Sequence, residues 1–250
     1  MDYSPNSLLS QTAHRSVKLP KGPWFSRQRW ENLLFYNVPV DPAALALCLP
    51  KGMQPDTFKG QAWISIVPFQ LCMTLRGLPK NIWPIRFNEL NVRVYVTVNG
   101  IPGVYFYSLD ADDAFSVAMA RGIFRLNYFN ASMQVNLASN NILFTSKRTH
   151  SGVAHSEFRA IYNPSGPVFT PTAGTLEDWL TSRWCFFCPA SNGSFIWGDI
   201  HHEPWPLQAA DVNILHNTLL MDHGLPPAIG QATMYFSKQV NVLAWSKAMF

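Results

Sequence analysis

The sequence predicts a mostly β fold of the α+β class with a few helices, and three observations support this. Apolar residues alternate without a break over residues 90–98, which is the period of a strand. Nine Trp, seventeen Phe and nineteen Pro favour strands and turns over long helices. Only 14% of the residues are charged, well below the usual quarter, which favours a compact globule over a disordered chain.

The chain has 250 residues and shows no repeat, linker or break in composition. We therefore expect a single domain over residues 21–250, after a polar, patternless segment 1–20 that we expect to be a flexible tail. The net charge of +4 comes from scattered Lys and Arg residues, so no nucleic-acid partner is expected.

Several features predict a cytoplasmic protein. No segment reaches the ~18 apolar residues of a membrane span, and the first residues lack the layout of a secretory signal. We therefore expect neither a membrane partner nor export. The four cysteines, at positions 48, 72, 185 and 188, would then be reduced.

Strands are expected where short apolar or alternating runs lie between turn signals. In chain order these runs are residues 24–38, 56–58, 61–69, 90–98, 101–110, 142–145, 157–162, 195–200, 232–236 and 240–245. Loops are expected at residues 75–84, where the chain would form the rim of a pocket, and at residues 164–171. Residues 207–220 fit neither the strand period nor the helix period.

Three helices are predicted from their start signals. Asp41 and the proline after it provide an N-cap and a first helical residue, and the helix would stop at residues 50–52. A second helix would begin at an N-cap at Asp112 or Asp113 and run through Arg121, closed by the glycine that follows. A third would begin after residue 175, where the capping-box spacing occurs.

The strand at residues 90–98 carries polar side chains on one face, because side chains alternate along a strand. This polar file begins with Glu89, Asn91 and Arg93. It could be the solvent-exposed face of an antiparallel sheet, which is the ordinary arrangement, or the wall of a pocket. Arg93 could bind an anionic substrate or form a structural ion pair with a nearby carboxylate.

An Asn-Gly pair at residues 99–100 predicts a two-residue hairpin turn. With that loop, Asn91 would face Ser108 and Glu89 would face Asp110. Two opposed carboxylates repel, so one of them would have a raised pKa unless a cation lies nearby. The Pro-Gly pair after the turn leaves a longer loop and a different register open.

Six stretches, in order over residues 24–245, carry a family resemblance: LPKGMQPDTFKGQAWISIVPF, FNELNVRVYVTVNGIPGVYFYSLDA, ARGIFRLNY, GTLEDWLTSRW, HHEPWPLQ and YFSKQVNVLAW. They resemble the domain-of-unknown-function family 2071, which is placed in the acetoacetate decarboxylase-like superfamily. The resemblance implies a curled, largely antiparallel sheet that forms an incomplete barrel. It also implies peripheral helices outside the sheet and a small-molecule pocket inside it.

A finer likeness concerns the chemistry. Acetoacetate decarboxylases carry a strand glutamate, a helix arginine and a Phe-Pro-Lys-Lys segment whose first lysine forms a Schiff base. By this resemblance Glu89 and Arg121 match the first two, and Tyr128 stands at the lysine position, within Leu-Asn-Tyr-Phe at residues 126–129. Tyrosine cannot form an imine, so a Schiff-base decarboxylase is not expected, and no cofactor is implied.

The other candidates each have a structural explanation. Arg121 could bind substrate, or could simply be favourable at a helix C-terminus. Tyr128 could be a pocket hydrogen-bond donor or a core aromatic residue. His202 could act as an acid or base or make a buried hydrogen bond. Cys185 and Cys188 are expected to be buried and inert.

The His-His-Glu run at residues 201–203 suggests a metal site, but we expect none. Neighbouring residues on a strand point to opposite faces, so the two histidines could not easily bind one ion. The spacings typical of zinc sites are also missing from the sequence.

Two functions remain open. The first is a small-molecule enzyme of the lyase, hydratase or isomerase type that moves protons next to a carbonyl group. Its catalytic residues would be Glu89, Tyr128 and His202, and its substrate-binding residues would be Asn91, Arg93, Ser108, Asp110 and Arg121. The second is a non-catalytic binding or sensing protein for small hydrophobic or aromatic metabolites. The sequence leaves open whether the chain forms a homo-oligomer.

Overall fold

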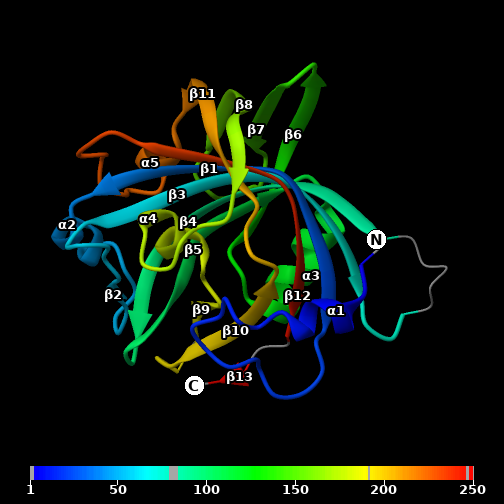
Figure 1. Ribbon diagram of the computed structural model, residues 1–250. Helices are drawn as coiled ribbons and strands as arrows, with labels where there is room; N and C mark the ends of the chain where they lie inside the picture. The colour runs from blue at the N-terminus through cyan, green and yellow to red at the C-terminus, as the bar shows by residue number, and fades with distance from the viewer. Residues whose placement is uncertain (1–2, 79–83, 191, 246–247, 250) are drawn as a thin grey trace.

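The computed structural model describes residues 3–78, 84–190, 192–245 and 248–249, and most of them lie in one large curled sheet (Figure 1). Its strands are β1 (Ser26–Val40), β2 (Gln54–Pro55), β3 (Ala62–Leu75), β4 (Ile85–Val98), β5 (Ile101–Ala111), β6 (Tyr128–Ala138), β7 (Asn141–Arg148), β8 (Glu157–Phe169), β9 (Cys185–Pro189), β10 (Phe195–His202), β11 (Leu207–Asn217), β12 (Thr233–Ala244) and β13 (Ala248–Met249). The helices are short: α1 (Pro5–Ser10), α2 (Pro42–Leu47), α3 (Ala114–Phe124), α4 (Leu176–Thr181) and α5 (Leu219–Asp222). The prediction of a mostly β fold with a few helices is confirmed.

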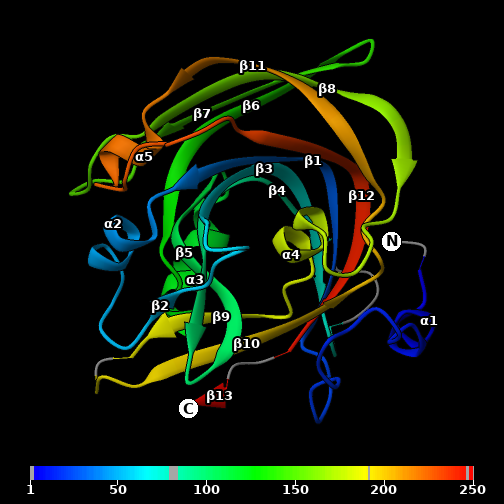
Figure 2. The same ribbon diagram turned by 60° about the vertical axis from the view of Figure 1, so that its left-hand side comes forward.

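The sheet closes on itself. Across the described residues, the strand order is β13-β10-β9-β5-β6-β7-β8-β11-β12-β1-β3-β4-β2. Additional pairings, β5 with β4 and β10 with β12, curl it into the ring that Figure 2 looks into. Most neighbours are antiparallel, but β5 runs parallel to both β6 and β9, so the sheet is mixed rather than wholly antiparallel. The parallel pair β5–β6 requires a crossover, which α3 provides.

The hairpin turn between β4 and β5 is confirmed. Val98 pairs with Ile101, and the two turn residues both have positive φ, 51° at Asn99 and 78° at Gly100. These are the backbone angles for which the Asn-Gly pair is favoured.

The predicted pairing farther along this hairpin is wrong. A β-bulge at Tyr107 shifts the register by one residue, so Glu89 does not face Asp110 and Asn91 does not face Ser108. Beyond the bulge, both β5 residues pair with apolar residues of the other β4 face. Ser108 and Asp110 therefore lie on the side of the sheet opposite to Glu89 and Asn91.

Both faces of β4 are buried, which sets up the site. Its apolar residues join the largest core cluster, on the side of the sheet where β6, β7 and β8 pack. Its polar face is covered at one end by α3, through Val117, and at the other by α4, through Leu180. Figure 2 shows α4 within the ring. The polar file predicted from the sequence is thus inside the protein.

Residues 3–20 differ from the flexible tail expected from the sequence. They include α1, whose Leu8 is buried against Leu243 and Trp245. The hydroxyl of Tyr3 donates to backbone oxygens of Gln28 and Val242. A few well-placed apolar residues anchor the segment, and such spacing is too sparse to give a periodic pattern.

The three predicted helices begin at the expected residues. Asp41 caps α2 by accepting from the Ala44 amide at 2.7 Å, and Thr175 caps α4. Helix α3 begins after Asp113 as expected but continues to Phe124, where Arg125 takes the left-handed conformation that we had assigned to a glycine. In the described part of the chain, no helix combines the length and the apolar content that crossing a membrane requires.

Several strands extend beyond their predictions. Residues 164–169, expected to be loop, continue β8, and the runs at residues 232–236 and 240–245 form one strand, β12. The ambiguous segment 207–220 contains β11 and the start of α5. Part of the loop predicted at residues 75–84, namely residues 79–83, lies outside the described residues.

Candidate functional site

A cavity of about 170 Å³ lies on the polar face of β4, and residues of α3 and of the segment that follows α4 contribute to its wall. Most of its wall consists of aromatic and aliphatic side chains from β1, β3 and β5. Its polar and charged side chains are Ser26, Gln28, Glu89, Asn91, Arg93, Ser116, Tyr128 and Arg183. Four residues of the predicted site, Glu89, Asn91, Arg93 and Tyr128, therefore share one wall.

Glu89 and Tyr128 form the central pair of the cavity. The Tyr128 hydroxyl donates to Glu89 Oε2 at 2.7 Å, and the Glu89 side chain is almost fully buried. Burial raises the pKa of Glu89 to about 7, with a further contribution from the charge of Asp110, while hydrogen bonds from Tyr128 and Asn91 oppose the rise. The pKa of Tyr128 is raised well above its ordinary value by burial and by the neighbouring carboxylate. A carboxyl group that titrates near neutral pH can both accept and donate a proton.

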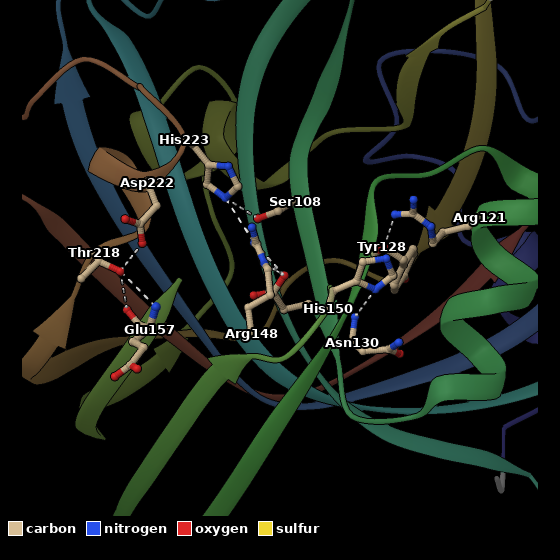
Figure 3. Close-up of polar contacts among 11 residues, drawn as sticks. Ser108, Arg121, Tyr128, Asn130, Arg148, His150, Glu157, Thr218, Asp222 and His223 are labelled. Atoms are coloured by element: carbon tan, nitrogen blue, oxygen red, sulfur yellow. Dashed lines mark hydrogen bonds and ion pairs between the residues drawn. The ribbon is translucent and has the colours of Figure 1, made fainter. Parts of the chain in front are cut away.

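The backbone around Tyr128 is fixed by its neighbours on two sides. Tyr128 pairs in parallel with Leu109 of β5, and Arg121 of α3 donates to the Tyr128 carbonyl oxygen at 2.7 Å (Figure 3). Arg121 itself is exposed and does not belong to the described cavity wall. Its position therefore supports a positioning role rather than direct substrate binding.

Arg93 also lines the cavity, and its guanidinium group contacts α4. Its guanidinium Nη2 donates to the Leu180 carbonyl oxygen at 3.1 Å and to the Tyr95 hydroxyl at 3.4 Å. The guanidinium carbon lies 5.4 Å from the centre of the Phe35 ring. Of the two alternatives for Arg93, the structural ion pair with Glu89 or Asp110 is not among the salt bridges of the described residues.

Arg183 is a cavity residue that the sequence interpretation did not single out. It follows α4 and donates from Nη1 to Asp56 at 2.5 Å and from Nε to the Trp179 carbonyl oxygen at 2.7 Å. Its spacing from Trp179 is the sequence feature that could have identified Arg183 as a cavity residue. Residues four apart on a helix lie on the same side, so Arg183 continues the side of α4 that faces the sheet.

Ser108 and Asp110 belong to a separate buried network on the other side of the sheet. Figure 3 shows Ser108 with its neighbours Arg148 and His223. Arg148 binds Asp110 Oδ1 through Nε and Nη2, at 2.9 and 2.8 Å. His223 Nε2 lies 2.9 Å from the Ser108 hydroxyl and 3.3 Å from Arg148 Nη2. Burial and Arg148 lower the pKa of His223 to about 4, so the ring is neutral at pH 7 and Nε2 accepts from both groups.

This network ties β5 to β7 and to the end of α5. Among the described residues, neither Ser108 nor Asp110 contributes to the cavity wall. Burial raises the pKa of Asp110 to about 6, although the Arg148 guanidinium works in the opposite direction. The network stabilises the sheet on the side opposite to Glu89. Ser108 and Asp110 lie on that side because the bulge at Tyr107 shifts the register.

His202 also lies away from the described cavity wall. Its ring stacks on Trp184 with 4.4 Å between the ring centres, and Nδ1 donates to the Glu203 carbonyl oxygen at 2.7 Å. Burial lowers the pKa of His202 to about 3, so the ring stays neutral over the physiological range. Its contacts favour the buried hydrogen bond over acid–base work.

The described wall contains neither a lysine nor a metal cluster. All the charged nitrogens that line the cavity belong to arginines. Among the described residues, no group of three or more His, Cys, Asp or Glu side chains is arranged to hold a metal ion. Cys185 and Cys188 are both buried, and burial raises the pKa of the Cys185 thiol to about 12.

Two sequence comparisons identify the relatives of this chain. The model of the domain-of-unknown-function family 2071, described as an uncharacterized conserved protein, matches residues 27–241. The chain is 38% identical over 232 residues to the uncharacterized protein YqjF of Bacillus subtilis (strain 168). That alignment covers 92% of this chain and 95% of YqjF.

Solved structures with a similar fold are distant in sequence. An acetoacetate decarboxylase-like enzyme from Sphingomonas wittichii RW1 matches with a TM-score of 0.60 at 12% identity, covering 94% of this chain and 98% of that one. Acetoacetate decarboxylase from Legionella pneumophila gives 0.59 at 13% identity, with 97% and 94% covered. The enduracididine biosynthesis enzyme MppR, complexed with pyruvate, gives 0.59 at 14% identity, with 94% and 92% covered.

At these identities the structural likeness shows the fold alone, whereas the family match spans most of the chain. The protein therefore belongs to the domain-of-unknown-function family 2071, and it has the acetoacetate decarboxylase-like fold.

Proposed function

We propose that this protein is an enzyme that moves a proton at the carbon next to a carbonyl group, as lyases, hydratases and isomerases do. The observation that carries the proposal is the Glu89–Tyr128 pair, joined by a 2.7 Å hydrogen bond in a largely apolar cavity. A buried carboxyl group with a pKa of about 7 is a suitable general base and acid at neutral pH.

The proposed step needs only groups that line the cavity. Glu89 takes a proton from the α carbon of the substrate, and the electron pair moves onto the carbonyl oxygen to give an enolate. The amide of Asn91, two residues along β4 on the same side, is the hydrogen-bond donor for that oxygen. Tyr128 holds the carboxyl group in place through Oε2. Returning the proton to the same carbon restores the ketone, and when a carbon–carbon double bond is conjugated with the enolate, returning it to the far end of that double bond completes an isomerisation.

A Schiff-base reaction does not fit the described wall. It requires a lysine amine, and Tyr128 occupies the position that the family likeness assigns to that lysine. The structural neighbours include decarboxylases and an enzyme complexed with pyruvate, which supports a small carbonyl compound as the substrate. We therefore propose a carbonyl compound as the substrate, as in these neighbours, and proton transfer by Glu89 in place of Schiff-base chemistry.

A second candidate, a non-catalytic binding or sensing protein, is favoured by the aromatic and aliphatic character of most of the wall. The two candidates differ in what Glu89 does. In a binding protein Glu89 would only hydrogen-bond the ligand, and no carbon–hydrogen bond would break.

Proton exchange in D₂O separates the two. The protein is incubated with a panel of aliphatic and aryl ketones and oxo acids, and loss of the α-proton signals is followed by NMR. We expect exchange with at least one compound and a fall in rate of about 100-fold or more in Glu89→Gln. The matched control is Glu157→Gln, which alters a partly exposed glutamate on β8 outside the described cavity wall and should exchange like the unchanged protein. Saturable binding without exchange would favour the binding protein, and exchange that survives in Glu89→Gln would refute the proposed role.

A further inference from the structure

Two buried arginines line the cavity near the C-terminal end of α4, and one of them is paired with a carboxylate. Arg93 and Arg183 both line the wall, and their exposed fractions are only 8% and 7%. They are close enough for the charge of Arg93 to act on Arg183. The carboxylate that compensates them is Asp56, which binds Arg183 at 2.5 Å and does not contact Arg93 through any salt bridge of the described residues.

Both guanidinium groups keep buried nitrogens that have no hydrogen-bond partner among the described residues. These are Nε of Arg93 and Nη2 of Arg183. Buried polar groups are nearly always hydrogen-bonded, and a buried charge usually has a counter-charge. The aromatic rings of Tyr95 and Trp179 lie against Arg183 and soften the repulsion, but they supply neither an acceptor for these nitrogens nor a negative charge.

We propose that Arg93 and Arg183 form a binding site for the carboxylate of the ligand. Guanidinium groups bind carboxylates through paired, charge-assisted hydrogen bonds, and the free nitrogens give this site unused donors. A ligand carboxylate would give Arg93 an anionic partner, as Asp56 already does for Arg183. The sequence offered Arg93 as one of several candidate substrate-binding residues. The structure places Arg183 in the same cavity wall.

The spacing along β4 narrows the ligand further, and this part of the inference rests on the proposed function of Glu89. Glu89 and Arg93 are four residues apart on one strand, so their Cα atoms are roughly 13 Å apart. A short oxo acid such as pyruvate, whose carboxylate is bonded directly to the carbonyl carbon, would not span both ends. The geometry therefore points to an acid whose carboxylate lies several bonds from the reacting carbonyl. Between the two ends, the amide of Asn91 is flanked by apolar side chains of the wall, including Phe106 and Leu109.

The test uses two unreactive probes, octanoate and octanamide, which share a chain and differ in charge. Their dissociation constants are measured by calorimetry on the full chain. We expect octanoate to bind about tenfold or more tightly than octanamide, since hydrogen bonds to a charged group discriminate by at least this much. In Arg93→Gln the preference for octanoate should disappear. In Arg159→Gln, which alters an exposed arginine on β8, it should remain.

Several results would overturn the site. They are equal binding of the two probes, no binding of octanoate at millimolar concentration, and a preference that survives in Arg93→Gln. If Arg93→Gln does not fold, the double variant Arg183→Gln with Asp56→Asn, which removes an ion pair together, should show the same loss of preference. The thermal unfolding temperature is also measured with chloride, inorganic phosphate or octanoate. An equal rise with all three would mean that the arginines bind a structural anion instead of a ligand carboxylate.

The length argument has its own readout. Proton exchange in D₂O is compared between 7-oxooctanoate and pyruvate, and we expect exchange only with the longer acid. Because the octanoate comparison involves no reaction, it can succeed even if no ketone exchanges, and then the proposed function fails while the carboxylate site stands. Faster exchange with pyruvate would refute the length argument alone.

Discussion

The pKa of Glu89 makes a quantitative prediction about stability. In the folded protein this pKa is about 7, against the ordinary 4.5, because the carboxyl group is buried. The folded state therefore binds the proton more tightly than the unfolded state does. At ~1.36 kcal/mol per pH unit, the difference corresponds to about 3 kcal/mol of unfolding free energy. This stabilisation is complete below pH 4.5 and is lost as the pH rises through 7.

Glu89→Gln isolates this contribution, because glutamine keeps the shape and does not titrate. The unfolding free energy of both proteins is measured in urea from pH 5 to pH 8. We expect the value for the unchanged protein minus that for Glu89→Gln to fall by about 2–3 kcal/mol over this range. Glu157→Gln is the control, because Lys147 lowers the pKa of Glu157 and its difference should change only slightly and in the opposite direction. A flat difference for Glu89→Gln would show that Glu89 ionises at its ordinary pKa.

The same titration tests the hydrogen bond between the pair. The bond from Tyr128 stabilises the ionised carboxylate, so Tyr128→Phe should raise the pKa of Glu89 further. The fall in stability should then move to higher pH. A move to lower pH would show that Tyr128 does not donate to Glu89.

Other predictions concern packing and the network behind the site, and thermal and urea unfolding check each of them. A Cβ at Gly198 would lie 2.1 Å from the Phe186 ring, so Gly198→Ala should destabilise by about 1–3 kcal/mol. Gly122→Ala, within α3 and with open space around it, should instead stabilise by roughly 0.5–1 kcal/mol. Arg148→Ala leaves the carboxylate of Asp110 buried without its partner and should cost about 3–5 kcal/mol. Adding Asp110→Asn should recover part of that loss, and no recovery would argue against the ion pair.

The features predicted correctly from the sequence are those that local chemistry determines. The Asn-Gly turn at residues 99–100 needs two residues that tolerate positive φ, and few pairs do. The caps at Asp41 and Thr175 depend on a side-chain oxygen a few residues from the amides it binds. In these cases the residues that decide the structure are neighbours in the chain, so the sequence alone contains the information.

The bulge at Tyr107 shows where this information ends. Alternation on β4 and β5 is equally compatible with a regular ladder and with one extra residue, because a bulge only reverses the side on which later side chains point. Its stabilising contact is distant, since the Tyr107 hydroxyl donates to the carbonyl oxygen of Cys48. The prediction for Ser108 and Asp110 was therefore wrong because it depended on a contact outside the hairpin, which no sequence pattern within the hairpin could reveal.

The polar file on β4 likewise shows that the sequence pattern alone does not determine whether these residues form a functional site. Alternation predicts that Glu89 and Arg93 share a side, and the structure agrees, but alternation is the same for a solvated face and for a cavity wall. Whether the face is solvated or buried depends on α3 and α4, which lie later in the chain and cover the two ends of that face. Covering the face is also what changes the chemistry, because a carboxyl group in water would keep its ordinary pKa and a solvated guanidinium would need no counter-ion. The elements that hide β4 from solvent thus turn an ordinary strand face into a candidate site. The hydrogen-bonded Glu89–Tyr128 pair belongs to it, as do arginine nitrogens that have no hydrogen-bond partner within the described part of the chain.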